Sequence, residues 1–181
     1  LYAMRQLYKS GALGKLVYTE GEYYHGPSLT GGGEVGSYKN WRVALPPQWY
    51  PTHSNAYYIG VTDGTFTEVS CLGRMKNSDK PYDNQYKNPF NSEIALYRTS
   101  EGGIARMGRT NTPGLASEVG RTQGEKGSYD GKYIGYEKNL PDLNRPALPP
   151  GVPEGGHGGS HGRLTNEFVS AIIQDRKPLV D

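Results

Sequence analysis

Four histidines are the residues of this sequence best suited to proton transfer or metal binding. His157 and His161 stand four residues apart, a spacing that could bind zinc together with His25 or His53. The two glycines between the pair disfavour a helix there, and no cysteine and no H-E-x-x-H motif accompanies them. We therefore predict no metal site. Loop histidines that hydrogen-bond a polyol are the preferred interpretation, and solvent-facing histidines without a task are the alternative.

A glycine-rich motif could bind a dinucleotide. Gly31, Gly33 and Gly36 satisfy G-x-G-x-x-G, but a polar segment and then prolines follow, where a nucleotide site needs an apolar-periodic helix. The position about twenty residues further on is Ala56 rather than an acid. We predict no cofactor-binding residues in this chain.

Residues 158–162 satisfy the G-x-S-x-G pattern of a hydrolase nucleophile around Ser160. That turn needs a strand before it and a catalytic histidine after it. A Pro/Gly-rich coil precedes the motif, and His161 is the last histidine of the chain. A serine hydrolase is therefore disfavoured.

Charge and composition exclude several classes of partner. The net charge is +2, and the 20 basic and 18 acidic residues form no stripe that could follow a phosphate backbone, so nucleic acid is not an expected partner. No apolar run approaches the roughly 18–20 residues needed to cross a bilayer, so no membrane partner is expected. Cys71 lies in an apolar-alternating stretch, which predicts a buried free thiol. The compartment stays open.

Apolar periodicity, together with glycine and proline breakers, predicts the helices and strands of the chain. Helices are expected up to Ser10, over 53–61, and at the end of the chain around Phe168. Strands are expected at 15–25, 65–74, 93–99 and 103–109, with weaker ones at 117–123 and 132–136. Long loops cover 26–51 and 140–159. This order predicts a single α+β domain over 1–181, built on an open, mostly antiparallel sheet with helices on one face.

The other sheet face must also be covered. The chain has 15 tyrosines against 3 phenylalanines, and tyrosine suits surfaces that are partly apolar and partly wet, such as interfaces and sugar sites. We therefore expect a homo-oligomer that forms through this face.

Four blocks of the sequence together resemble one family: residues 14–25, 40–42, 50–54 and 155–161. The chain is similar, from residue 1 to 181, to the C-terminal half of the glucose-fructose oxidoreductase and inositol dehydrogenase family. The resemblance implies an α+β substrate-binding and oligomerisation domain. It also implies that the N-terminal nucleotide-binding domain, which holds NAD or NADP in the full-length enzyme, is absent from this chain.

The resemblance also assigns roles to residues. His53 resembles the histidine that moves the hydroxyl proton of a sugar-like substrate while hydride passes to or from the nicotinamide. Many members have an aspartate four residues before it, where this chain has Trp49, so the residue that orients His53 is open. The expected substrate-binding residues are Tyr23, His25, Arg42, His157 and His161.

Three functions fit these observations. The first is the substrate domain of an oxidoreductase acting on a sugar or cyclitol. The second is the corresponding domain of an NAD-dependent glycosidase, which the form Tyr50-Pro51-Thr52-His53 resembles. The third is a stand-alone binding or oligomerisation module without catalysis.

Overall fold

The structure is a computed structural model that describes residues 1–26, 45–112, 114 and 116–178. It divides into two compact units, Leu1–Leu143 and Asn144–Asp181. Arg42 and the glycine-rich motif at 31–36 lie outside the described residues. The expectation of a single domain over 1–181 stays a prediction.

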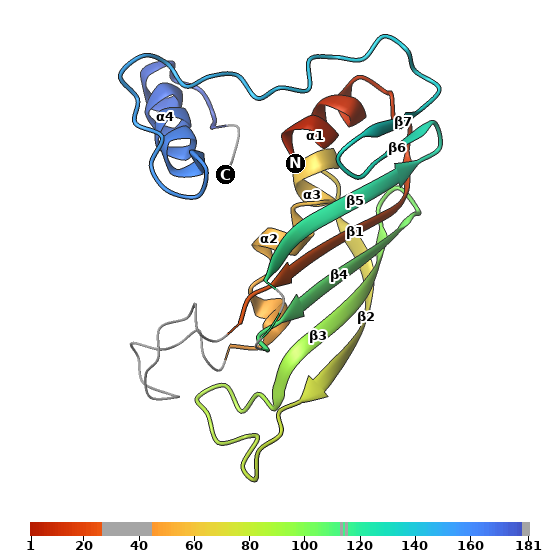
Figure 1. The fold of residues 1–181 in the computed structure, drawn as a ribbon, viewed down its shortest axis with the longest axis vertical. Helices are drawn as coiled ribbons and strands as arrows, with labels where there is room; N and C mark the ends of the chain where they lie inside the picture. The colour runs from red at the N-terminus through yellow and green to blue at the C-terminus, as the bar shows by residue number, and fades with distance from the viewer. Residues whose placement is uncertain (27–44, 113, 115, 179–181) are drawn as a thin grey trace. The chain divides into compact units, whose positions relative to one another are not determined.

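The first unit is built on one seven-stranded sheet with the order β2-β3-β4-β1-β5-β6-β7 (Figure 1). The parallel pair is β1–β4, and the other neighbouring strands pair antiparallel. This confirms the predicted α+β fold with an open, mostly antiparallel sheet. The strands are β1 (Leu16–Tyr24), β2 (Phe66–Met75), β3 (Phe90–Thr99), β4 (Ile104–Thr110), β5 (Ser117–Gly124), β6 (Gly127–Tyr129) and β7 (Tyr133–Gly135).

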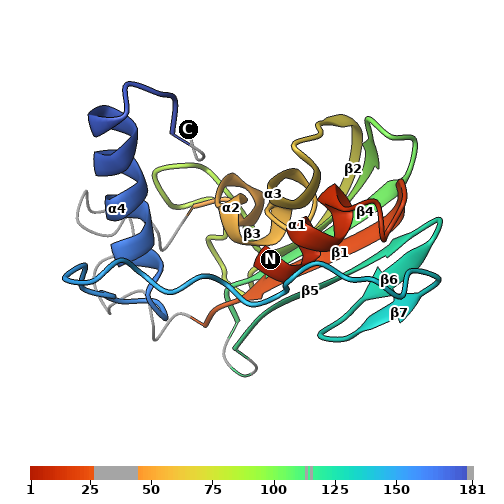
Figure 2. The ribbon, with the colours of Figure 1, turned by 90° about the horizontal axis from the view of Figure 1, so that it is seen from above.

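Short helices cover one face of this sheet, and Figure 2 shows α1, α2 and α3 together on that side. They are α1 (Tyr2–Lys9), the 3-10 turn η3 (Pro47–Trp49), α2 (Thr52–Asn55) and α3 (Ile59–Thr62). The helix expected over 53–61 is thus two single turns. Between them, Leu7, Leu13, Tyr58, Val61 and Met107 form the fully buried centre of the core.

Two glycines let α2 approach the sheet closely. Gly21 of β1 and Gly120 of β5 are directly opposite each other in the ladder. A Cβ atom at Gly21 would overlap the Ser54 carbonyl, and one at Gly120 would overlap the Tyr57 ring. Thr19 also donates a hydrogen bond of 3.0 Å to the Tyr57 carbonyl. The backbone of the α2 segment therefore rests almost directly on β1 and β5.

The expected burial of Cys71 is wrong, and β1 departs from strict alternation at its start. Cys71 is an exposed free cysteine, because β2 is an edge strand and its residues beyond Phe66 are exposed on both faces. In β1, strict alternation would place Leu16 on the face that points away from the core, but Leu16 is buried and Val17 is exposed. A register shift between Leu16 and Tyr18 reverses the faces at this point.

The second unit contains α4 (Ser160–Ile173), which begins after Gly159 in the left-handed conformation. Arg176 pairs with Glu167 of this helix at 2.6 Å. Within the parts of the chain that the structure describes, no helix combines the length and apolar character needed to span a membrane.

Candidate functional site

Four aromatic rings gather where α2 meets the end of β1. The imidazole of His53 lies flat on the Tyr23 ring, with centroids 4.1 Å apart and an interplanar angle of 8°. The Tyr50 ring stacks on His53 at 5.4 Å, and the His25 ring lies 5.3 Å from Tyr23. The close approach of α2 to the sheet brings these rings together, so three residues singled out in the sequence, Tyr23, His25 and His53, form one cluster.

A carboxylate faces the imidazole of His53. Glu118 projects from β5, where it is directly opposite Tyr23 in the ladder. Its Oε1 lies 3.0 Å from Nδ1 of His53. Both side chains remain in contact with solvent, with 28% of His53 and 47% of Glu118 exposed.

An arginine supports the aromatic cluster. The guanidinium carbon of Arg109 lies 4.9 Å from the Tyr23 ring centroid and 5.0 Å from that of Tyr50. Arg109 is buried and donates a hydrogen bond of 2.9 Å to Asn111. Cation–π contacts are stronger when the cation is desolvated, so Arg109 fixes both tyrosines.

A buried carboxylate stands directly opposite Arg109 on the neighbouring strand. Glu93 of β3 pairs in register with Arg109 and accepts the backbone N–H of Gln48 at 2.7 Å. Burial raises the pKa of Glu93, although the Gln48 N–H and the charge of Arg109 oppose the rise. Through Gln48, this carboxylate anchors η3, and with it the start of the segment that carries Tyr50 and His53.

The remaining predicted site residues belong to the second unit or lie outside the described residues. His157 and His161 belong to the second unit, where their rings meet edge to face at 4.8 Å. Arg42 lies outside the described residues. The substrate-binding roles of these three residues stay predictions.

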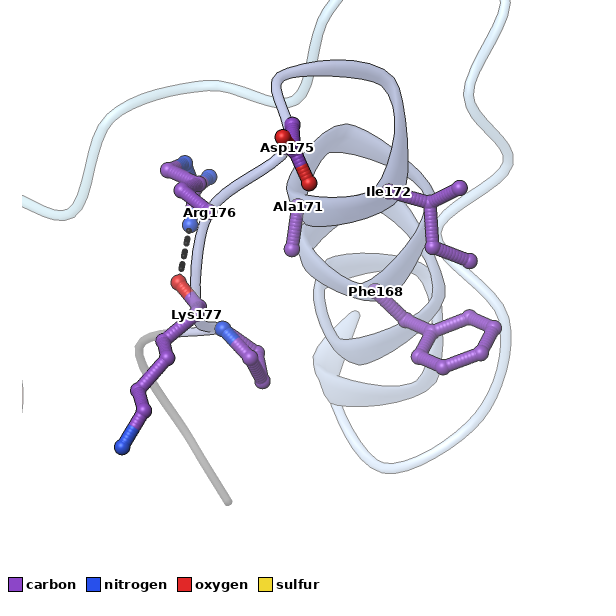
Figure 3. Close-up of a pocket in the computed structure, with 7 residues that line it drawn as sticks. Phe168, Ala171, Ile172, Asp175, Arg176 and Lys177 are labelled. Atoms are coloured by element: carbon purple, nitrogen blue, oxygen red, sulfur yellow. Dashed lines mark hydrogen bonds between the residues drawn. The ribbon is translucent and has the colours of Figure 1, made fainter.

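The second unit carries a hollow of its own beside α4 (Figure 3). It is lined by Phe168, Ala171 and Ile172 on the helix and by Asp175, Arg176, Lys177 and Pro178 after it. Phe168 and Ile172 are largely exposed. None of the histidines lines the hollow, and Arg176 already pairs with Glu167, so the hollow is not taken as the candidate site.

Sequence reasoning did not single out Glu118, Arg109 or Tyr50 as site residues. Glu118 lies on a strand whose polar composition gave only a weak strand signal. Alternation along β4 and β5 would place Arg109 and Glu118 on the helix-covered face, but nothing in the sequence specifies which residues of β1 they adjoin.

No protein-family model and no curated protein matches the sequence. Among solved structures, the chain is similar to a levoglucosan dehydrogenase in complex with NADH and L-sorbose, with a TM-score of 0.67 and 14% identity over 99% of this chain and 55% of that one. An oxidoreductase domain protein from Kribbella flavida gives a TM-score of 0.64 and 17% identity over 99% and 56%. The myo-inositol dehydrogenase from Lactobacillus casei, in complex with NAD(H) and myo-inositol, gives 0.56 and 11% over 98% and 49%.

These structures are NAD-dependent sugar or cyclitol dehydrogenases or a related oxidoreductase, and the chain spans about half the length of each. At such low identity the likeness concerns the fold alone. The chain therefore has the α+β fold found in one half of these dehydrogenases.

Proposed function

We propose that this chain is the substrate-binding and assembly domain of an NAD(P)-dependent oxidoreductase that acts on a hydroxyl of a sugar or cyclitol. The observation that carries the proposal is His53, held between Tyr23, Tyr50 and Glu118 where α2 meets the ends of the neighbouring strands β1 and β5. The imidazole is partly exposed, so a small polar molecule can reach it.

In the proposed reaction, His53 accepts the proton of the substrate hydroxyl as that carbon is oxidised, and it returns the proton in the reverse direction. An imidazole suits this exchange because its unperturbed pKa lies near neutral pH. Tyr23 and His25 offer hydrogen-bonding groups and ring faces to a polyhydroxylated ring. His157, His161 and Arg42 remain further candidates for hydroxyl binding.

The glycine-rich motif at 31–36 lacks the sequence context of a dinucleotide site, because a polar segment and prolines follow it where such a site needs a helix. NAD or NADP, which accepts or supplies the hydride when bound, is therefore proposed to be held by a separate nucleotide-binding domain. In this proposal, the described residues bind the substrate and do not bind the cofactor.

Assembly is proposed to use the sheet face opposite the helices. The side chains of Leu72, Leu96, Ile104 and Val119 on that face are each at least half exposed. A second copy of the chain that covers them would give a homo-oligomer with an isologous interface.

The second candidate function is an NAD-dependent glycosidase. The segment Tyr50-Pro51-Thr52-His53 favours it, and the structure places both Tyr50 and His53 in the aromatic cluster. A stand-alone module would keep the fold and lack turnover altogether.

The coding sequence upstream of Leu1 and the activity of the natural full-length protein test these functions. Full-length protein that reduces NAD or NADP with levoglucosan or myo-inositol supports the dehydrogenase. Release of the aglycone from nitrophenyl glycosides, dependent on NAD, supports the glycosidase. An unrelated upstream domain, together with no activity on either substrate class, contradicts both and favours the module.

Cofactor binding by the isolated chain is a separate test. Titration calorimetry with millimolar NAD or NADP is expected to give no heat beyond dilution. Saturable binding with a dissociation constant in the micromolar range would place a cofactor site in this chain. It would contradict the proposal that a separate domain binds the cofactor.

A further inference from the structure

The ring of His53 is fixed in position by two contacts that leave little freedom of orientation. Tyr23 holds the plane of the imidazole, because the two rings are stacked at 4.1 Å and 8°. Glu118 then fixes which edge of the ring faces β5, because its Oε1 lies 3.0 Å from Nδ1. Tyr23 and Glu118 come from directly paired positions of β1 and β5, so the sheet itself sets their separation.

The protonation of the ring follows from the chemistry of its partner. An ionised carboxylate accepts hydrogen bonds and cannot donate one. A neutral imidazole that is hydrogen-bonded to Glu118 therefore carries its proton on Nδ1, and its lone pair is on Nε2. Nε2 is then the nitrogen able to take a proton from a substrate hydroxyl.

The position of Glu118 is also held from the α2 segment. Tyr57 donates a hydrogen bond from its hydroxyl to the Glu118 carbonyl at 3.3 Å, and its ring packs on Gly120 two residues along β5. The stretch that carries His53 is thus tied to the strand that carries Glu118. The two side chains are held at a fixed distance although both are partly exposed.

Trp49 stands where many members of the family that the sequence resembles have an aspartate, and it does not take this role. Its side chain is 67% exposed and meets the edge of the Tyr86 ring at 5.9 Å. An indole has only an N–H donor, so it could not accept the proton of Nδ1.

We propose that Glu118 is the positioning residue of His53, holding the imidazole as the Nδ1–H tautomer so that Nε2 is the proton acceptor. The inference rests on the proposed function only for the role of Nε2 as the proton acceptor. The tautomer itself is a property of this chain and can be measured without substrate or cofactor.

The experiment is long-range ¹H–¹⁵N NMR on the ¹⁵N-histidine-labelled chain at alkaline pH, where the neutral tautomers are distinguished by which ring nitrogen carries the proton. The His53→Gln variant assigns its signals among the four histidines. Wild-type His53 is expected to be mainly Nδ1–H. In Glu118→Ala it is expected to become mainly Nε2–H, the form preferred by free histidine, and Glu118→Asp should restore part of the Nδ1–H population.

The control is Glu68→Gln, which removes another exposed carboxylate, paired with Arg98 at 3.2 Å on the edge strand β2. It should leave the His53 signals unchanged. Melting temperatures of all variants separate a change of tautomer from loss of the fold. If Glu118→Ala melts too low to be measured, Glu118→Gln keeps the shape and should still show a mixture of tautomers.

A His53 tautomer that is the same in wild type, Glu118→Ala and Glu118→Gln would overturn the inference, whatever the enzyme does. In the full-length protein, Glu118→Ala should lower kcat on levoglucosan or myo-inositol by roughly 10–10²-fold with a smaller change in KM, by analogy with the scale for partners that orient metal-ligating histidines. If His53→Asn leaves turnover intact while the tautomer responds to Glu118, the proposed function fails and the inference about Glu118 stands.

Discussion

The two faces of the sheet use the same strands for different purposes. On the helix-covered face, alternate residues of β1, β4 and β5 place Tyr23, Arg109 and Glu118 around His53. On the open face, the intervening residues form an ion network in which Glu20 pairs with Arg106 and Arg121. The covered face presents the aromatic cluster around His53 to solvent, and the charged groups of the open face pair with one another.

One carboxylate on each face has a shifted pKa, and the two shifts have opposite directions. Burial would raise the pKa of Glu20, but hydrogen bonds from Tyr18 and Arg121 and the charges of Arg106 and Arg121 outweigh burial, so the pKa is lowered. The pKa of Glu93 on the covered face is raised by burial, which outweighs the Gln48 N–H and the charge of Arg109. Folding therefore favours the charged form of Glu20 and penalises the charged form of the buried Glu93.

Which face of the sheet a residue occupies, rather than its type, decides whether it belongs to the candidate site or to the open face. Arg106 and Arg109 lie on the same strand three residues apart. Arg109 fixes aromatic rings beneath the helices, whereas Arg106 belongs to the open ion network. Substitutions on the two faces should therefore affect different measurements, namely turnover on one and assembly on the other.

The largest expected effect concerns catalysis on the covered face. His53→Asn in the full-length protein should lower turnover by about 10²–10⁴-fold, or roughly 3–5 kcal/mol of barrier, because it removes the general acid–base group. Cofactor binding should be unchanged. Steady-state kinetics and cofactor titration measure both effects, and Glu68→Gln is the control.

The competing assignment gives a distinct pattern. If His157 or His161 transfers the proton, His53→Asn should lower the melting temperature with near-normal turnover of the folded fraction. His157→Asn or His161→Asn would then carry the larger catalytic loss.

The next largest effect concerns assembly through the open face. Wild-type protein at micromolar concentration should have at least the mass of a dimer by light scattering. Leu96→Glu should yield monomer, because a charge at a buried apolar contact costs about 2 kcal/mol or more, roughly a 30-fold weaker association.

A matched control for Leu96 lies on the helix side of the sheet. Ile59 of α3 is a comparably exposed apolar residue, so Ile59→Glu should leave the dimer mass unchanged. A monomeric wild-type chain would mean that the open face is not an interface in this chain alone.

A smaller effect concerns the glycine pair that lets α2 approach the sheet. Gly120→Ala should destabilise the fold by about 1–3 kcal/mol, the range for overpacking, because its Cβ would overlap the Tyr57 ring. Thermal unfolding measures this change. Gly60→Ala is the control, since its Cβ would meet only the Ala56 Cβ at 3.7 Å in ordinary contact. Equal melting temperatures for the two variants would contradict close packing of α2 as the requirement at Gly120.

Much of this fold could be predicted from the sequence because its strands are strongly periodic. The run from Ile104 to Thr110 alternates core and open-face residues as expected, and β1 does so after Leu16. Prediction failed where tertiary context decides burial. Cys71 alternates like a buried strand residue, yet β2 lies at the sheet edge and no element covers it.

The site could be predicted only in part. Resemblance pointed to His53 and Tyr23, and the structure stacks them. The partner of His53 could not be found from sequence, because Glu118 lies 65 residues away and reaches it only through the pairing of β1 with β5. The sequence does not show which residues of β1 and β5 are paired, so it could not identify Glu118 as the partner.

The smallest expected effect is a difference between the two faces in how the stability of the fold depends on pH. The pKa of Glu20 is lowered on folding, so its ionisation stabilises the fold above its unfolded value near 4.5, and this contribution is lost as pH falls through the folded pKa. The pKa of Glu93 is raised, so its contribution is complete below the unfolded value and is lost as pH rises through the folded pKa.

Glu20→Gln and Glu93→Gln should therefore change the pH dependence of unfolding in opposite directions. Relative to wild type, Glu20→Gln should be destabilised at pH 7, by up to about 1 kcal/mol for an ion pair of this partly exposed kind, and should approach wild-type stability toward pH 3. Glu93→Gln should instead gain stability relative to wild type as pH rises from 4 to 7, because the glutamine cannot ionise in its buried position. Urea unfolding of the three proteins at several pH values measures both slopes. If the stability of both variants relative to wild type changed with pH in the same direction, the contrast would be contradicted. That contrast is between Glu20, whose pKa is lowered beside Arg106 and Arg121, and Glu93, whose pKa is raised by burial.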